Sequence, residues 1–223
     1  MNETLIAGAL FLLTHLGVSS TPLRGVLVGR LGLNVYRVLY SVLAFVTLWL
    51  LISAYNDAAR LEYFWGIDPR LYWVPKILMW FALVFAVGSF MVKNPTSIGF
   101  EDAMAQPVSG LNRITRHPFQ WGVVMWSASH IVANGDTVSV VFFSSFLVLS
   151  LAGTFLMDIK MKAAGGDWEQ LAWRTSNIPF RAIVQGRNTL EIGELVGPMV
   201  VGTVLYLAIF WGHQWVSGVP IFW

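Results

Sequence analysis

The sequence predicts an all-α membrane protein, a polytopic bundle of about six transmembrane helices in a single domain covering residues 1–223. Three observations support this fold class. The chain is 56% hydrophobic and only 12% charged, whereas soluble domains carry roughly 25% charged residues. Its mean hydropathy is +0.64. Six stretches without charge each come close to the ~20 residues that a helix needs to cross the hydrocarbon core.

The six stretches follow one another with charged loops between them. We expect helices over residues 4–23, 38–56, 77–92, 117–135, 137–157 and 195–211. Residues 73–75 would extend the short third stretch at the interface, and a short amphipathic surface helix is expected at 165–173. No basic residue precedes the first stretch, so we expect it to be retained rather than cleaved as a signal peptide.

Basic residues are concentrated in the loops after the first, third and fifth stretches. Those loops carry 11 of the 14 lysines and arginines, whereas Arg60, Arg70 and Lys76 lie in the loops on the other side. The positive-inside rule therefore predicts that loops one, three and five are cytoplasmic and that both termini are outside. The basic residues of the odd-numbered loops are Arg24, Arg30, Arg37, Lys93, Arg113, Arg116, Lys160, Lys162, Arg174, Arg181 and Arg187.

Charge balance and cysteine content exclude several function classes. The formal net charge is only +2, without the clustered basic footprint of a nucleic-acid surface. The chain has no cysteine, which rules out disulfides, thiolate metal ligands and cysteine nucleophiles. The sequence contains no visible Ser-His-Asp arrangement, phosphate-binding glycine loop or nucleotide-binding fingerprint. The expected partners are the lipid bilayer and small or hydrophobic molecules.

Two histidines lie inside stretches expected to span the membrane, where ionisable groups are costly and usually functional. His130 shares a helical face with Trp126, and His15 shares one with Phe11. A hydrogen bond to a neighbouring helix would also explain either imidazole by itself. Two such histidines, with no carboxylate in any span, favour a shared ligand.

Among the centres that imidazole binds, haem b suits these residues best. A hydrolytic zinc site needs a third protein ligand and a general base, and no span offers a carboxylate. Haem needs one or two axial side chains and an otherwise apolar, aromatic surface, to which Trp126 would contribute. We therefore predict haem b as the cofactor, with His15 and His130 as metal ligands.

The residues before the fourth stretch form a second candidate region. Arg116 and His117 stand at a helix start marked by Pro118, where the helix N-terminus favours an anionic group such as a haem propionate or a phosphate. The alternative is an interfacial residue that closes a loop. His117 and His130 lie on nearly opposite faces of one helix, so they are not expected to share an iron.

Three further ionisable residues are not expected to take part in a functional site. Asp158 ends the fifth stretch and is expected to be a solvated charge among the lipid headgroups. Asp136 follows an Asn-Gly turn signal and is expected to be a turn residue. His213 lies beyond the last stretch, and no role is assigned to it.

The sequence resembles the NnrU family of bacterial membrane proteins, whose plant relative is 15-cis-zeta-carotene isomerase. Three sets of residues carry the resemblance: 15–20 with Arg24, Gly32 and 36–41; 116–118 with Gly122 and Trp126; and 129–136 followed by Asp158. The resemblance implies a helical protein of the bacterial inner membrane that is associated with nitrite and nitric oxide metabolism.

The plant relative implies a haem b enzyme that isomerises a polyene double bond when its iron is reduced. The resemblance places its two histidine ligands at His15 and His130. Ser127 stands where that enzyme has a cysteine, so a cysteine-linked ligand switch is not expected here. A hydrophobic polyene or a small nitrogen oxide is the implied ligand. Redox protein, isomerase and accessory factor for a membrane reductase all stay open.

A second resemblance is to the isoprenylcysteine and phospholipid methyltransferases. It rests on residues 116–118 with Gly122, 166–168 and 178–179. This alternative implies S-adenosylmethionine bound at the cytoplasmic face, with His117 and Asp158 functional and His130 in a packing role. The paired tyrosines of that family are replaced here by Trp168 and Trp173.

Overall fold

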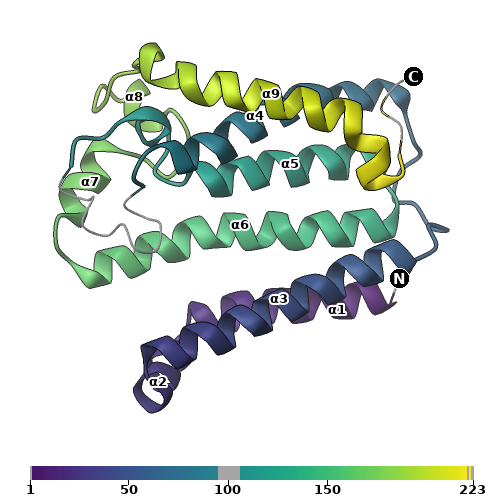
Figure 1. Cartoon of the computed structure of the whole chain (residues 1–223), viewed down its shortest axis with the longest axis horizontal. Helices are drawn as coiled ribbons and strands as arrows, with labels where there is room; N and C mark the ends of the chain where they lie inside the picture. Colours follow the sequence, from purple (N-terminus) through teal and green to yellow (C-terminus); the bar gives the residue numbers. More distant parts are fainter. Residues whose placement is uncertain (1, 95–105, 220, 222–223) are drawn as a thin grey trace.

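The computed structural model describes residues 2–94, 106–219 and 221, and this part of the chain is built of helices joined by short loops (Figure 1). The α-helices are α1 (Asn2–Leu12), α2 (Pro22–Leu31), α3 (Leu33–Asp57), α4 (Trp73–Met91), α5 (Pro118–Asn134), α6 (Thr137–Ala164), α7 (Trp168–Arg174), α8 (Arg181–Val184) and α9 (Ile192–Ser217). A π-helical segment, η1 (Leu13–Val18), continues α1, and 3₁₀ turns lie at Pro69–Tyr72 and Gly110–Arg113. The predicted all-α class is confirmed, and α7 occupies the place of the predicted surface helix.

In this part of the chain, four helices are long and apolar enough to cross a membrane: α3, α4 with its preceding turn, α6 and α9. A fifth span results if the broken α1–α2 segment counts as one. Helix α5 has 17 residues, which at about 1.5 Å per residue gives roughly 25 Å, less than the ~30 Å of the hydrocarbon core. The structure therefore supports a membrane protein with four or five candidate spans where the sequence predicts six.

The first predicted span is broken instead of continuous. The chain bends by 73° between Val18 and Pro22. The hydroxyls of Ser19 and Thr21 donate to the carbonyls of His15 and Gly17, and such local bonds compete with the helical backbone ladder. The Thr21 side chain then caps α2, where Pro22 suits the first helical position because it has no N–H to leave unpaired.

Local signals fix the boundary between α5 and α6. Gly135 ends α5 in the left-handed conformation, with φ +71°, which a glycine adopts without steric cost. Asp136 caps α6 by accepting a hydrogen bond from the backbone N–H of Ser139 at 2.8 Å. The structure thus confirms that Asp136 belongs to a turn, and it adds the capping role.

Helix α5 lies between α4 and α6, and α9 packs along α4 (Figure 1). Helices α1 and α3 cover another side of α6. A Cβ atom on Gly122 would lie 2.8 Å from the carbonyl oxygen of Ala82, and one on Gly202 would lie 2.8 Å from Cα of Val84. These two glycines therefore permit the close approach of α4 to α5 and of α4 to α9, as small residues do between membrane helices.

Candidate functional site

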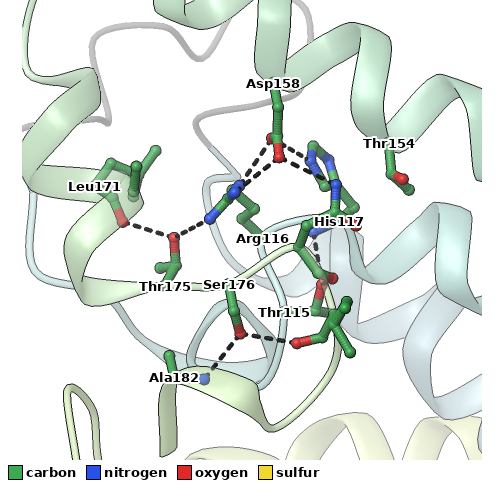
Figure 2. Close-up of polar contacts among 12 residues, drawn as sticks. Thr115, Arg116, His117, Thr154, Asp158, Leu171, Thr175, Ser176 and Ala182 are labelled. Atoms are coloured by element: carbon green, nitrogen blue, oxygen red, sulfur yellow. Dashed lines mark hydrogen bonds and ion pairs between the residues drawn. The ribbon is translucent and has the colours of Figure 1, made fainter. Parts of the chain in front are cut away.

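Arg116, His117 and Asp158 form a polar cluster at the end of the helix group where α5 begins (Figure 2). The guanidinium of Arg116 donates two hydrogen bonds to the Asp158 carboxylate, from Nε to Oδ1 at 2.8 Å and from Nη2 to Oδ2 at 2.7 Å. His117 Nε2 lies 2.7 Å from Oδ1 of the same carboxylate. Asn177 donates its side-chain amide to Oδ2 at 3.0 Å. The carboxylate of α6 therefore accepts bonds from three side chains outside its own helix.

His117 is fully buried at the start of α5, and this burial governs its protonation. Removal from water lowers the pKa of the His117 imidazole and outweighs the opposing influence of Asp158. The neutral ring then donates from Nε2–H to Asp158. Its Nδ1 has no hydrogen-bond partner within the described ranges. A proton on Nδ1 would have no acceptor, which is consistent with the neutral form.

Residues 175–177, called the strap below, lie beside this cluster, and Figure 2 shows Thr175 next to Arg116. The carbonyl oxygen of Asn177 accepts from the hydroxyl of Thr115 at 2.6 Å and from the indole N–H of Trp121 at 2.8 Å. The backbone N–H of Arg116 donates to the carbonyl of Ser176 at 3.0 Å. These bonds join the strap, which follows α7, to the start of α5.

Two expectations about this region require correction. Asp158 is not a solvated headgroup charge: its side chain is 19% exposed and is engaged by Arg116 and His117. Arg116 is directed at this internal carboxylate, and its guanidinium also lies over the ring of Trp168, 5.2 Å from the centroid. Arg116 and His117 do not present an open anion site, because the anion that they bind is the Asp158 carboxylate of α6.

His130 lies near the C-terminal end of α5, away from this cluster. Its Nδ1 is 2.7 Å from the carbonyl oxygen of Trp126, one turn earlier. The ring stacks on Phe143 of α6, with centroids 4.8 Å apart. On another side it meets the ring of His213 from α9, with centroids 6.5 Å apart. His213 thus lies within α9, and its expected place beyond the last span is wrong.

His15 lies in the π-helical segment that follows α1. Such segments are frequent at functional sites because they turn a side chain out of regular register. The Nδ1 of His15 is 2.8 Å from the carbonyl oxygen of Phe11, and the rings of these two residues are 4.3 Å apart. The ring of Tyr40 in α3 lies 6.3 Å away.

An aromatic chain connects the surroundings of the two histidines across α6. Phe11 beside His15 contacts Phe146, with ring centroids 5.1 Å apart, and Phe146 contacts Trp126 at 5.1 Å. Trp126 in turn lies 5.7 Å from His130. In the described structure, no contact joins the His15 and His130 imidazoles directly. Trp126, which is predicted to contribute to an aromatic surface beside His130, does lie next to that ring.

The imidazoles of His15 and His130 could bind a haem iron, because each has one ring nitrogen free to coordinate a metal. A carbonyl oxygen only accepts, so we assign the proton of each ring to Nδ1 at His15 and at His130, which leaves Nε2 with its lone pair. Metal-bound histidines usually hold their second nitrogen in this way. Ser127 donates its hydroxyl to Val123 of its own helix at 2.7 Å. The described residues include no group of three or more His, Cys, Asp or Glu side chains placed to hold a metal ion.

The fold and these two regions define a polytopic helical membrane protein with histidines in its helices and a buried Arg-His-Asp cluster at one end. The chain belongs to the NnrU family, since the family described as NnrU protein matches residues 4–221. The resemblance that the sequence motifs indicate is therefore confirmed.

Two curated relatives are plant proteins with the same name, "15-cis-zeta-carotene isomerase, chloroplastic". The one from Arabidopsis thaliana is 28% identical over 220 residues, and the one from Zea mays is 29% identical over 226 residues. Each alignment covers 94% of this chain but only 59% of the plant protein. The chain thus spans about three fifths of the length of these relatives. No solved structure matches it.

Sequence reasoning missed two residues of these regions, Asn177 and His213. His213 had a usable signal, because the charge-free run that contains it continues well past the expected end of the last span. Asn177 had none, since a single amide in a polar loop does not reveal which carboxylate it binds.

Proposed function

We propose that this NnrU protein is a membrane-embedded haem b protein that isomerises a cis double bond of a hydrophobic polyene. The proposed metal ligands are His15 and His130. The substrate class is carried over from the two plant relatives, which are named for the isomerisation of 15-cis-zeta-carotene. Because the chain spans about three fifths of their length, the activity of the whole plant protein is part of the proposal and does not follow from the similarity.

One observation supports the cofactor most directly: His15 and His130 share the same hydrogen-bonding arrangement. Each Nδ1 faces the carbonyl oxygen four residues earlier, at 2.8 and 2.7 Å. This bond fixes the tautomer and the ring orientation before any metal arrives, and it raises the basicity of Nε2. When bound, haem iron supplies a redox-variable Lewis acid. His15 and His130 would supply two imidazole nitrogens to the iron. The aromatic side chains next to His130 (Trp126, Phe143 and Phe146, here called the aromatic wall) would exclude water.

The aromatic wall suits a polyene better than a polar substrate. The rings of Trp126 and Phe143 contact His130, with centroids 5.7 and 4.8 Å away, and Phe146 contacts Trp126 at 5.1 Å. Flat conjugated chains pack well against such rings, and the apolar surroundings exclude water from the double bond. The Arg116–His117–Asp158 cluster has a supporting role here, because its bonds hold the start of α5 against α6.

The proposal includes the membrane topology. We propose six membrane crossings, with α5 as a short crossing between α4 and α6 and with the broken α1–α2 segment as the first. The distribution of basic residues supports cytoplasmic loops one, three and five and outer termini. The bacterial inner membrane is the proposed location, and the link to nitrite and nitric oxide metabolism stays a prediction from the family resemblance.

The methyltransferase alternative is less well supported. Its two central residues, His117 and Asp158, are bonded to each other, and His117 is fully buried. Arg116 and Asn177 occupy the same carboxylate. S-adenosylmethionine would have to displace this arrangement in order to reach either residue. We therefore keep this function only as an outcome of the test.

The test uses the full chain purified in detergent. We expect a Soret band that His15→Ala and His130→Ala each abolish and that His117→Ala retains. We also expect the reduced protein, but not the oxidised one, to convert a 15-cis polyene to its trans isomer, as measured by chromatography. A colourless protein that binds S-adenosylmethionine in isothermal calorimetry would replace this proposal with the methyltransferase function. A pigmented protein without isomerisation under either redox condition would restrict the proposal to haem binding.

A further inference from the structure

The turn between α2 and α3 brings Arg24 and Tyr36 together. Gly32 makes this turn with φ +79°, a conformation that a glycine adopts without steric cost. Its N–H donates to the carbonyl of Val28 at 2.9 Å, and its own carbonyl accepts from the N–H of Tyr36 at 3.1 Å. Helix α2 therefore folds back on α3, and the Arg24 guanidinium lies 5.7 Å from the centroid of the Tyr36 ring.

Tyr36 and Arg24 both carry hydrogen-bonding groups that the described residues leave unsatisfied. Tyr36 is buried, with 5% of its surface exposed, and its hydroxyl makes no hydrogen bond of normal geometry within the described ranges. The Arg24 guanidinium acts on this hydroxyl electrostatically, but in the same ranges it forms no ion pair with a carboxylate. A buried polar group without a partner costs free energy. Two neighbouring donors without an acceptor therefore indicate a site for an oxyanion.

A line of aromatic contacts connects this site with His15. The rings of Tyr36 and Tyr40 stack one helical turn apart, with centroids 5.8 Å apart and planes that differ by 15°. Tyr40 in turn meets the His15 ring edge-on, with centroids 6.3 Å apart. The unsatisfied donors thus lie two ring contacts from a proposed iron ligand. Arg116, in which the sequence predicts an anion site, is already engaged by Asp158.

The charge and position of this site suit a propionate of a haem bound at His15. An ionised carboxylate is costly within the hydrocarbon core, so the propionates of a membrane-embedded haem need cationic partners near an interface. Arg24 is partly exposed, and α2, which carries it, lies at the end of the molecule where α6 ends (Figure 1). This end faces the cytoplasm in the proposed topology. A guanidinium donates to a carboxylate at two points, and a phenol hydroxyl donates at one.

We propose that Arg24 and Tyr36 bind one haem propionate and thereby orient the haem on the His15 side of the molecule. The inference rests on the proposed function, because it requires a haem whose iron is bound by His15. Arg24 supplies the positive charge, and Tyr36 supplies a neutral donor that is already held in place by burial. A phospholipid phosphate offers the same oxyanion chemistry, and the test separates the two sources.

The test compares the binding of haem with that of haem dimethyl ester, in which both propionates are esterified and uncharged. The full chain in detergent is titrated with each compound, and the Soret absorbance gives the dissociation constant. The variants are Arg24→Gln, which removes the charge, and Tyr36→Phe, which removes only the hydroxyl. Arg30→Gln is the matched control, because Arg30 is an exposed arginine of the same helix.

We expect Arg24→Gln to weaken haem binding roughly tenfold to hundredfold and Tyr36→Phe to weaken it by up to about tenfold, as the loss of a charged and of a neutral hydrogen bond predicts. Arg30→Gln should bind haem as the wild type does. All four proteins should bind the dimethyl ester with the same affinity, because the ester carries no oxyanion. Without haem, Tyr36→Phe should melt at the wild-type temperature or above it, since it removes an unsatisfied buried hydroxyl.

Two results overturn the inference. If Arg24→Gln weakens the binding of haem and of its dimethyl ester equally, the arginine does not bind a propionate. If Arg24→Gln keeps the wild-type affinity for haem but loses a bound phospholipid in native mass spectrometry, the oxyanion is a lipid phosphate.

The outcomes also separate this inference from the proposed function. A wild-type protein that binds haem and is insensitive to both Arg24→Gln and Tyr36→Phe retains the proposed cofactor and refutes the role of these two residues. A wild-type protein that binds neither haem nor its dimethyl ester refutes the proposed function and this inference with it.

Discussion

The imidazole Nε2 of His117 lies 2.7 Å from Oδ1 of Asp158, although 41 positions separate the two residues in the chain. This bond connects the start of α5 to α6. Arg116 and Asn177 bind the same carboxylate, so one acidic side chain joins two helices and the strap of residues 175–177. The Asp158 carboxylate therefore contributes to the stability of this end of the molecule.

Asp158→Asn removes that charge while keeping the size of the side chain. We expect a loss of roughly 3 kcal/mol, because breaking a largely buried ion pair leaves Arg116 without a compensating charge. The melting temperature of the protein in detergent measures the effect. Asp68→Asn is the matched control, since Asp68 also binds an arginine, at 2.8 Å, but on the exposed surface. Equal melting temperatures for the two variants would contradict the structural role of the cluster.

The buried state of His117 predicts a pH dependence of stability. Burial lowers the pKa of this imidazole, so between its folded pKa and the unfolded value of about 6.5 the unfolded chain binds more protons than the folded one. The stabilisation is therefore complete above about pH 6.5 and is lost as the pH falls toward the folded pKa.

Melting temperatures of wild type and His117→Gln at pH 7.5 and 5.5 check this expectation. The wild type should lose more stability on acidification than the variant, because the variant lacks this titrating ring. The other histidines are present in both proteins, so their contribution cancels in the comparison. If His117→Gln loses as much stability on acidification as the wild type does, groups other than His117 cause the pH dependence.

Gly122→Ala tests the close contact between α4 and α5. The added Cβ would meet the carbonyl oxygen of Ala82 at 2.8 Å and the backbone nitrogen of Ala86 at 3.1 Å. Backbone atoms do not move aside as side chains do, so we expect a loss of about 1–3 kcal/mol. Gly153→Ala in α6 is the control, since its Cβ meets no atom within 4 Å and alanine favours a helix. The control should melt at the wild-type temperature or above it.

Asp136 provides a test that separates helix capping from catalysis. Its carboxylate accepts from the backbone N–H of Ser139 at 2.8 Å. Asp136→Ala should cost about 1 kcal/mol or more, because it removes both the cap and the ion pair with Arg60, 3.8 Å away. Asp136→Asn should lose only that ion pair, because asparagine caps a helix as well as aspartate does. Both variants should keep the haem spectrum. A spectrum that changes in Asp136→Asn would indicate a role at the metal.

The absence of cysteine permits a direct test of orientation. Asn56→Cys places a thiol at the end of α3, and Lys162→Cys places one at the end of α6. A maleimide that does not cross membranes should label the first variant in intact cells and the second only after the membrane is opened. The reverse pattern would place loops one, three and five outside.

The helices and their ends were predictable because their signals are local. The bounds of α5 follow from Pro118 at its start and from the left-handed Gly135 after its last residue. The bend after His15 was not foreseen, because residues 19–21 are uncharged and so do not interrupt the predicted span, although the hydroxyls of Ser19 and Thr21 bind the preceding carbonyls. In lipid, a run of apolar residues indicates a helix but does not indicate where it is broken.

By itself, the sequence determined the helical membrane class, the positions of most helices, the family and the histidines worth testing. Only the tertiary structure decided which side chains meet: Asp158 binds Arg116 and His117, and His130 contacts His213 but not His15. The physical reason is that a helix surrounded by lipid is apolar on nearly every face, so its sequence carries little information about its rotation. That rotation is set by close packing at small residues such as Gly122 and Gly202, which brings residues from distant helices into contact.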